Sequence, residues 1–118
     1  MISSVGSNQA ALRAYSSLLN SNANNIANVN TENYKRQDTI VNQDNNLQPS
    51  AQVRRENSPG PVKQTISNDG MQKYQEMSNT DLAKEMTEMV AAENFYTSNL
   101  KTIETQSQMT GTIIDIKG

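Results

Sequence analysis

Closely spaced carboxylates are the residues of this chain with the clearest capacity for chemistry. Asp81 and Glu85 lie four residues apart, and Glu88 follows Glu85 by three. Paired acids serve glycosidases and metal-assisted hydrolases. On a helix, however, these spacings place the acids on one exposed face, where charged groups are solvated. Nothing supplies a shaped pocket or a Gly-rich phosphate loop, so the sequence predicts no catalytic residue, no cofactor and no metal ligand.

The residue types that are missing exclude further reactions. The chain has no Cys and no His, which removes disulfides, thiol nucleophiles, the usual zinc sites and imidazole acid–base catalysis. The methionines are better explained as adaptable packing than as ligands. A net charge of −2 and a pI near 5.0 provide no basic field for phosphates. Neither an enzyme nor a nucleic-acid-binding protein is expected.

Composition limits what the chain can bury alone. It has 118 residues, enough for one domain, but only 34% are hydrophobic, with one Phe and no Trp. A compact domain of this size usually carries about 45–50% apolar residues. Either other copies complete the core, or much of the free chain is disordered.

Targeting signals are not visible either. The start of the sequence lacks a basic segment followed by an apolar run, so we expect no cleavable secretion signal. No apolar run approaches the ~20 residues that a membrane-spanning helix needs. The chain is expected to be soluble, or to leave the cell by a route that reads no such signal.

An amphipathic helix is predicted over residues 4–29. Val5, Leu12, Leu19 and Ile26 follow one another at intervals of seven, which is one face of a helix. Many asparagines crowd the end of this segment, and Asn is a mediocre helix former, so packing must hold the helix. The asparagines either form a polar face of the helix that is exposed to solvent, or they are buried between neighbouring helices, where their amides must find partners.

The middle of the chain, residues 34–78, is predicted to be loop with a small β unit. Strands are expected at 52–56 and 62–66, joined by a turn at Pro59-Gly60, and 42–46 is expected to be loop. Asn68-Asp69-Gly70 supplies a second turn. Because an isolated hairpin is marginal, it needs a helix or a neighbour to lie on.

A second long helix is predicted over 79–118. Ser78 and Asp81 match a capping box. Leu82, Met89, Tyr96 and Ile103 form a seven-residue series, and an apolar end follows the weak point at Gly111. The predicted fold is therefore mainly α, with long N- and C-terminal helices paired as an antiparallel coiled-coil-like hairpin and a small β-hairpin and loop region between them.

Two stretches resemble the motifs of the bacterial flagellar axial proteins, the rod, hook and hook-associated subunits. Residues 23–36 read Ala-Asn-Asn-Ile-Ala-Asn-Val-Asn-Thr-Glu-Asn-Tyr-Lys-Arg, similar to the family's N-terminal motif. Residues 79–90 and the end of the chain at 113–117 look like its C-terminal motif. Glu32-Asn33 stands where Pro-Gly is common, and Glu93-Asn94-Phe95 replaces a more usual pair before the Tyr. Hook and distal rod subunits carry a large insertion between the motifs, so this chain most resembles a short proximal rod subunit.

The resemblance implies a subunit exported unfolded through the flagellar type III apparatus. It would then polymerise with itself and neighbouring axial proteins into a tube that crosses the periplasm in the basal body. Residues 1–33 and 79–118 would pair as an inner coiled-coil domain, and 34–78 would form a small outer unit. The predicted subunit-packing residues are Val5, Leu12, Leu19, Asn25, Ile26, Asn28, Val29, Asn30, Leu82, Met86, Met89, Tyr96, Leu100, Ile103, Ile113 and Ile114.

A second interpretation keeps the helical hairpin and changes its use. A stand-alone adaptor or export chaperone that binds a partner helix in the cytoplasm also fits amphipathic seams. It gives no reason for the Asn-rich end of the first helix. No small-molecule substrate is expected under either interpretation.

Overall fold

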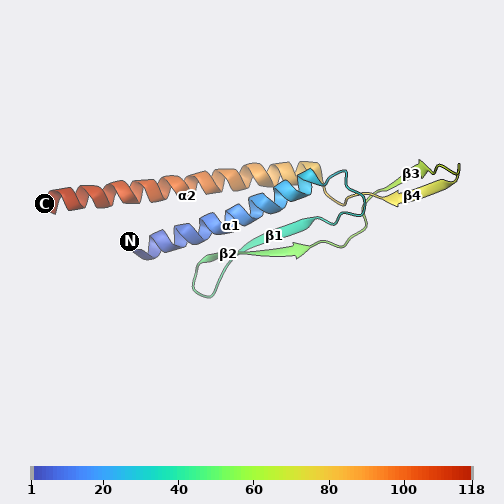
Figure 1. Ribbon diagram of the computed structural model, residues 1–118. Coiled ribbons are helices and arrows are strands. Elements are labelled where there is room, and N and C mark those ends of the chain that lie inside the picture. The colour runs from blue at the N-terminus through green and yellow to red at the C-terminus, as the bar shows by residue number, and fades with distance from the viewer. Residues whose placement is uncertain (1, 118) are drawn as a thin grey trace.

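Two long helices and two separate hairpins make up the molecule. The computed structural model describes residues 2–117, with side chains from residue 5 onward, so the ends of the predicted segments at Met1 and Gly118 lie outside it. The elements are α1 (Ile2–Ala27), β1 (Gln37–Gln43), β2 (Pro49–Arg55), β3 (Val62–Ile66), β4 (Gln72–Glu76) and α2 (Leu82–Lys117). The molecule is elongated, with extents of 82 × 26 × 18 Å (Figure 1).

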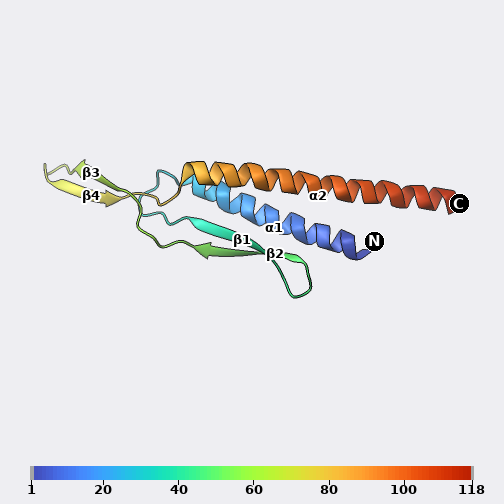
Figure 2. The same ribbon diagram turned by 180° about the vertical axis from the view of Figure 1, so that it is seen from behind.

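The two helices run antiparallel side by side, which confirms the predicted fold class (Figures 1 and 2). The fully buried hydrophobic residues of the molecule are small. Ala11, Ala14 and Ala92 are the buried hydrophobic residues of the described chain. Small side chains let the backbones approach closely, but they remove little apolar area from water. The helix pair therefore has a thin apolar core for its length.

The pairing of the middle strands differs from the prediction. Strand β2 pairs with β1 around a turn at 44–48, and β3 pairs with β4 around the turn that contains Gly70. The predicted hairpin between 52–56 and 62–66 is therefore wrong, and 42–43 belong to a strand rather than a loop. Proline in the segment 57–61 breaks the strand pattern, and these residues cross between two sheets instead of closing one.

The two hairpins have different surroundings. The β1–β2 hairpin lies along α1, where Thr39 donates a 2.6 Å hydrogen bond to Ser21 of the helix. Small residues on both sides, including Ala10 and Ala14 of α1 and Ala51 of β2, line the space between them. The β3–β4 hairpin packs on no other helix or strand in residues 2–117 and projects away from the helices (Figure 1). We call this projecting hairpin the arm.

Candidate functional site

A polar junction joins the helices, β1–β2 and the arm. It comprises the end of α1 at Asn25, and segments 34–37, 56–60 and 76–79, together with Glu85 at the start of α2. Three connections cross here, so many backbone groups leave regular structure and need new partners. Polar side chains supply these partners, and the largest fully buried side chains of the described chain are Glu85, Asn22 and Asn25.

Asn25 ties α1 to the start of β1. Its Oδ1 accepts hydrogen bonds from the Gln37 backbone N–H at 2.8 Å and from the Tyr34 hydroxyl at 3.1 Å. Its Nδ2 donates to the Gln37 carbonyl at 2.8 Å. The side chain is 0% exposed in the single chain. Asn25 was predicted as a contact between subunits, and within the single chain its amide is already buried and hydrogen-bonded.

Asn79 likewise uses its amide to join separate backbone segments, on the other side of the junction. Its Oδ1 accepts from the Arg36 backbone N–H at 2.7 Å, and its Nδ2 donates to the carbonyls of Glu56 and Ser58 at 2.9 and 3.0 Å. One amide thus holds the chain entering β1 against the chain leaving β2. The sequence interpretation placed Asn79 in a capping sequence and missed this role, because nothing in the local pattern reveals a contact with segments more than twenty residues away.

The base of the arm is fixed by a charged contact and a close backbone approach. The Lys35 ammonium pairs with the Glu76 carboxylate, which also accepts from the Gly60 backbone N–H at 2.9 Å. The bond from Lys35 and then that from Gly60 lower the pKa of Glu76. A Cβ on Gly60 would lie 2.1 Å from the Met77 carbonyl oxygen, so only glycine fits this crossing. The arm is therefore held at a defined angle although it touches no other element beyond the junction.

Glu85 is the most unusual residue of the junction. It was predicted to lie on a solvated face, and this is wrong, since the residue is 1% exposed and neither carboxylate oxygen has a partner with hydrogen-bond geometry. Burial raises the pKa of Glu85, and the nearby carboxylates of Glu88 and Asp38 raise it further. The Asn25 amide and the Lys84 ammonium lower it, without offsetting the burial. One inward series of α2 runs through Glu85, Ala92, Asn99 and Gln106 at intervals of seven, and this series is small and polar, beside the half-buried Met89, Tyr96 and Ile103.

The helix ends also differ in detail from the prediction. Helix α2 begins at Leu82, and Asp81 caps it by accepting from the backbone N–H groups of Ala83 and Lys84 at 3.1 and 3.3 Å. The predicted capping box at Ser78 is therefore wrong, and Ser78 instead bonds to Thr80. At the end of α1, the Asn28 amide donates to the Asn24 carbonyl, and Asn33 takes a positive φ of 58°, which confirms the predicted turn.

The predicted packing residues divide into two groups. Those half-buried in the single chain are Val5, Leu12, Leu19, Ile26, Asn28, Val29, Met89, Tyr96 and Ile103. Those left exposed are Asn30, Leu82, Met86, Leu100, Ile113 and Ile114. The series beginning at Leu82 turns inward only from Met89 onward, because a seven-residue repeat drifts around a straight helix. In the pair of helices, the Tyr15 and Phe95 rings stack at 5.3 Å.

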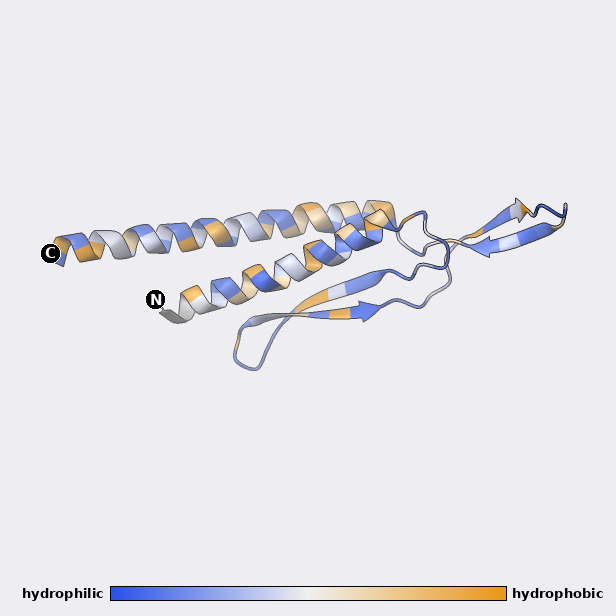
Figure 3. Cartoon of the chain, viewed as in Figure 1, coloured by the Kyte–Doolittle hydropathy of each residue, from blue (hydrophilic) through white to orange (hydrophobic). Residues whose placement is uncertain are grey.

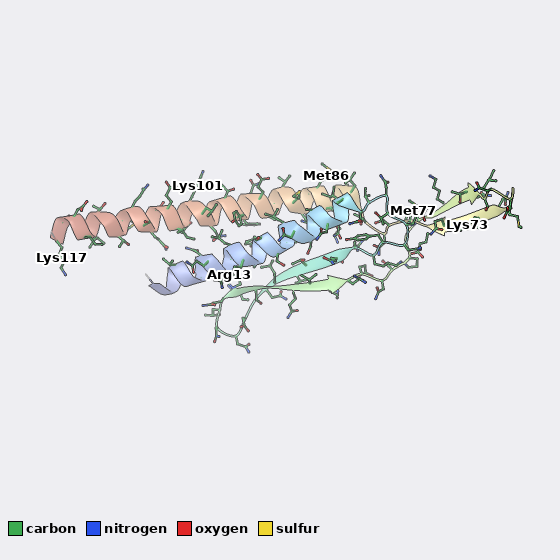
Figure 4. All side chains as sticks on the ribbon, viewed as in Figure 1. Arg13, Lys73, Met77, Met86, Lys101 and Lys117 are labelled. Atoms are coloured by element: carbon green, nitrogen blue, oxygen red, sulfur yellow. The ribbon has the colours of Figure 1, made fainter. Side chains whose placement is uncertain are left out.

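Exposed apolar side chains gather in two places on α2. Leu82, Met86 and Val90 form a stripe on its first turns, and the Met86 side chain lies on the side away from α1 (Figure 4). At the other end, Ile113, Ile114 and Ile116 are 51%, 63% and 81% exposed. Orange segments recur along α2 up to this end (Figure 3). Uncovered apolar side chains at regular positions on a helix indicate an interaction surface.

Neither a metal site nor a membrane helix is found in the described part of the chain. Residues 2–117 contain no group of three or more metal-ligating side chains. No described helix is long and apolar enough to cross a bilayer.

Comparison with known proteins identifies the α2 region. Residues 71–116, which span β4 and nearly all of α2, match the family model described as "Flagellar basal body rod FlgEFG protein C-terminal". Residues 71–116 are thus similar to the C-terminal region of flagellar rod and hook proteins. This match agrees with the axial family that the sequence resembles.

Individual relatives agree with the family match. The chain is 43% identical over 42 residues to the flagellar hook protein FlgE of Escherichia coli strain K12, and equally to those of Salmonella typhimurium LT2 and Salmonella typhi. The matched segment is 36% of this chain and spans about 10% of each hook protein. The similarity is thus confined to one segment of a much longer relative.

Proposed function

We propose that this chain is a structural subunit of the flagellar axial structure, in the proximal rod of the basal body, and that it polymerises through its terminal helices. The match of residues 71–116 to the rod and hook family carries the proposal. The residues between α1 and α2 form only two short hairpins, in line with the short middle region of a proximal rod subunit. Catalysis plays no part in this function.

The physical state of α2 supports assembly as its role. Its last turns are exposed on every side and end in three exposed isoleucines, so a single chain gains little from ordering them. Ordering becomes favourable when neighbouring helices cover these side chains, at about 25 cal/mol per Å² of apolar area. The predicted packing residues at this end, Leu100, Ile113 and Ile114, are the proposed contacts between subunits.

Export and location follow from the same proposal. A chain that must pass unfolded through the flagellar type III apparatus benefits from a thin apolar core, because little stabilising burial has to be undone. The three buried alanines match this requirement. The proposed neighbours are further copies of the chain and other rod and hook proteins.

Two cellular experiments test the proposal. Cells lacking the chain should stop building the axial structure before the hook, as seen by electron microscopy of isolated basal bodies. Cells carrying a chain that lacks residues 113–118 should export it and fail to incorporate it. An adaptor or export chaperone would instead remain in the cytoplasm, and complete basal bodies in the deletion strain would contradict the proposal.

A further inference from the structure

The arm is attached to the rest of the molecule through the junction. Within residues 2–117 it packs on no other helix or strand, and it extends away from both helices (Figures 1 and 2). Two connections carry it, residues 56–61 before β3 and residues 77–81 before α2. The contacts that fix the direction of the arm must therefore lie at its base, where these two connections meet.

One carboxylate oxygen joins the base of the arm to both neighbouring segments. Glu76 is the last residue of β4, and its Oε1 pairs with the Lys35 ammonium and accepts from the Gly60 backbone N–H at 2.9 Å. The Lys35 ammonium also donates to the Ser58 carbonyl at 3.0 Å. Glu76 thus ties the end of β4 to the segment that precedes β1 and to the segment that precedes β3.

Backbone hydrogen bonds at the base leave the angle of the arm open. The bond from the Met77 N–H to the Pro61 carbonyl, at 2.8 Å, closes the hairpin itself and does not attach it to anything else. The Asn33 N–H donates to the Glu76 carbonyl at 3.0 Å and joins the hairpin to the rest of the chain. Because one bond permits rotation about itself, the side-chain contacts of Glu76 are needed to set the angle.

These contacts favour the ionised form of Glu76. The bond from Lys35 and then the bond from Gly60 lower the pKa of Glu76 below its ordinary value of 4.5, although burial acts in the opposite direction. Hydrogen bonds to a carboxylate, one of them from a cation, stabilise its charge. The same bonds are weakened when the carboxyl group takes up a proton.

Other charged groups around the base do not compete for this contact. Lys63 and Lys73 lie on the face of the hairpin opposite to Glu76. Tyr74 shares the face of Glu76, but a phenol is neutral in the pH range where a carboxyl group titrates. In the preceding connection, the Glu56 carboxylate accepts from a backbone N–H of its own segment at 3.2 Å. Lys35 is therefore the cation on which the contact depends.

We propose that the ionised Glu76 carboxylate locks the arm in one direction, and that protonation of Glu76 releases the arm to pivot about its base. A neutral carboxyl group forms no ion pair with Lys35 and accepts more weakly from Gly60. The backbone bond from Asn33 then remains as the pivot. The lock is a property of the single chain, so it goes beyond the proposed function and does not depend on it.

The arm and the two helices respond to pH in opposite senses. Since the pKa of Glu76 is lowered by folding, its contribution is complete above 4.5 and is lost as pH falls through the lowered value. The pKa of buried Glu85 is raised, so its proton is retained as pH falls. Acid that frees the arm therefore does not place a charge in the contact between α1 and α2.

Backbone order parameters from NMR relaxation of the full chain test the lock. At pH 7 the amides of β3 and β4 in the wild type should be as rigid as those of β1 and β2, at about 0.85. In Glu76→Gln, which is neutral at every pH, they should fall below about 0.6 while β1 and β2 are unchanged. Asp69→Asn is the matched control, because it removes an exposed carboxylate at the turn of the arm and should leave all values unaltered.

Titration of the wild type gives a second measurement. The order parameters of the arm should fall with the same midpoint as the Gly60 amide proton shift, below pH 4.5, and Glu85→Gln should retain this transition. A rigid arm in Glu76→Gln at pH 7, or a midpoint that does not follow Gly60, would overturn the proposal. Loss of the cross-strand contacts between Lys63 and Gln75 in Glu76→Gln would also overturn it, since the hairpin would then melt rather than pivot.

Discussion

The junction and the far end of α2 use side chains in opposite ways. At the junction, polar groups are buried and bonded to the backbone of their own chain, as Asn25 and Asn79 show. At the far end of α2, apolar groups such as Ile114 and Ile116 are exposed. Hydrogen bonds are directional, so the junction sets geometry, whereas apolar contact depends on area and can be made with a neighbour. The comparison indicates that a single chain fixes its shape at the junction and leaves apolar side chains of α2 uncovered, which the proposed assembly would bury.

Replacing Asn25 should break the junction most severely. Asn25→Ala removes the partners of the Gln37 N–H, the Gln37 carbonyl and the Tyr34 hydroxyl at once. Leaving such buried groups unsatisfied costs about 3 kcal/mol in total. Hydrogen exchange should show the junction amides opening more readily by that amount. Asn24→Ala is the matched control because its side chain is exposed, and an equal effect from both variants would contradict a special role for Asn25.

A substitution at Gly60 tests whether the angle of the arm depends on the close approach of Gly60 to the Met77 backbone. In Gly60→Ala the added methyl group meets the Met77 carbonyl oxygen, and the backbone has to shift. Overpacking of this kind costs about 2 kcal/mol. Exchange of the Met77 and Gly60 amides should speed up while α1 and α2 are unaffected. Unchanged exchange at these two amides would show that the crossing is looser than the structure indicates.

The buried carboxyl makes the junction sensitive to pH. Because burial raises the pKa of Glu85, the folded chain keeps its proton at pH values where the unfolded chain has lost it. The free energy of unfolding should therefore fall as pH rises from the ordinary value of 4.5 to the raised value, and then level off. Helix content measured by circular dichroism should follow the same course.

Glu85→Gln should remove this part of the pH dependence, since the replacement is neutral throughout. Glu88→Gln is the control on the same helix, at a half-buried position that pairs with Lys84. It should retain most of the fall in stability, because burial is the main cause of the raised pKa of Glu85 and the Glu88 charge adds only to it. If both variants keep the wild-type profile, another group accounts for the pH dependence and the assignment to Glu85 is wrong.

The smallest expected effect is at the far end of α2. A Cβ on Gly111 meets nothing within 4 Å, so Gly111→Ala should stabilise the end of α2 by about 1 kcal/mol through helix propensity alone. Helix content of the isolated chain should rise slightly. A loss of helix content would show that Gly111 serves a packing purpose within the single chain.

Sequence patterns predicted the two helices, the turn after α1 and the similarity of the C-terminal region to rod and hook proteins, because periodicity and local motifs encode them. They failed where distant segments meet. The pairing of β1 with β2 depends on α1 as a platform, and the burial of Glu85 depends on a seam of small residues such as Ala92. The predicted seven-residue series began at Leu82, which is exposed, whereas the most buried positions of α2 are Glu85 and Ala92, one polar and one small. The strand pairing and the burial of Glu85 both depend on contacts between segments that are far apart in the sequence.

Hydrogen exchange of the isolated and assembled chain, followed residue by residue, tests the central claim most directly. We predict that the junction amides of Arg36, Gln37 and Asn79 are protected in both states, whereas amides 105–117 exchange rapidly in the isolated chain and become protected on assembly. Strong protection of 105–117 in the isolated chain, with no gain on assembly, would contradict the account.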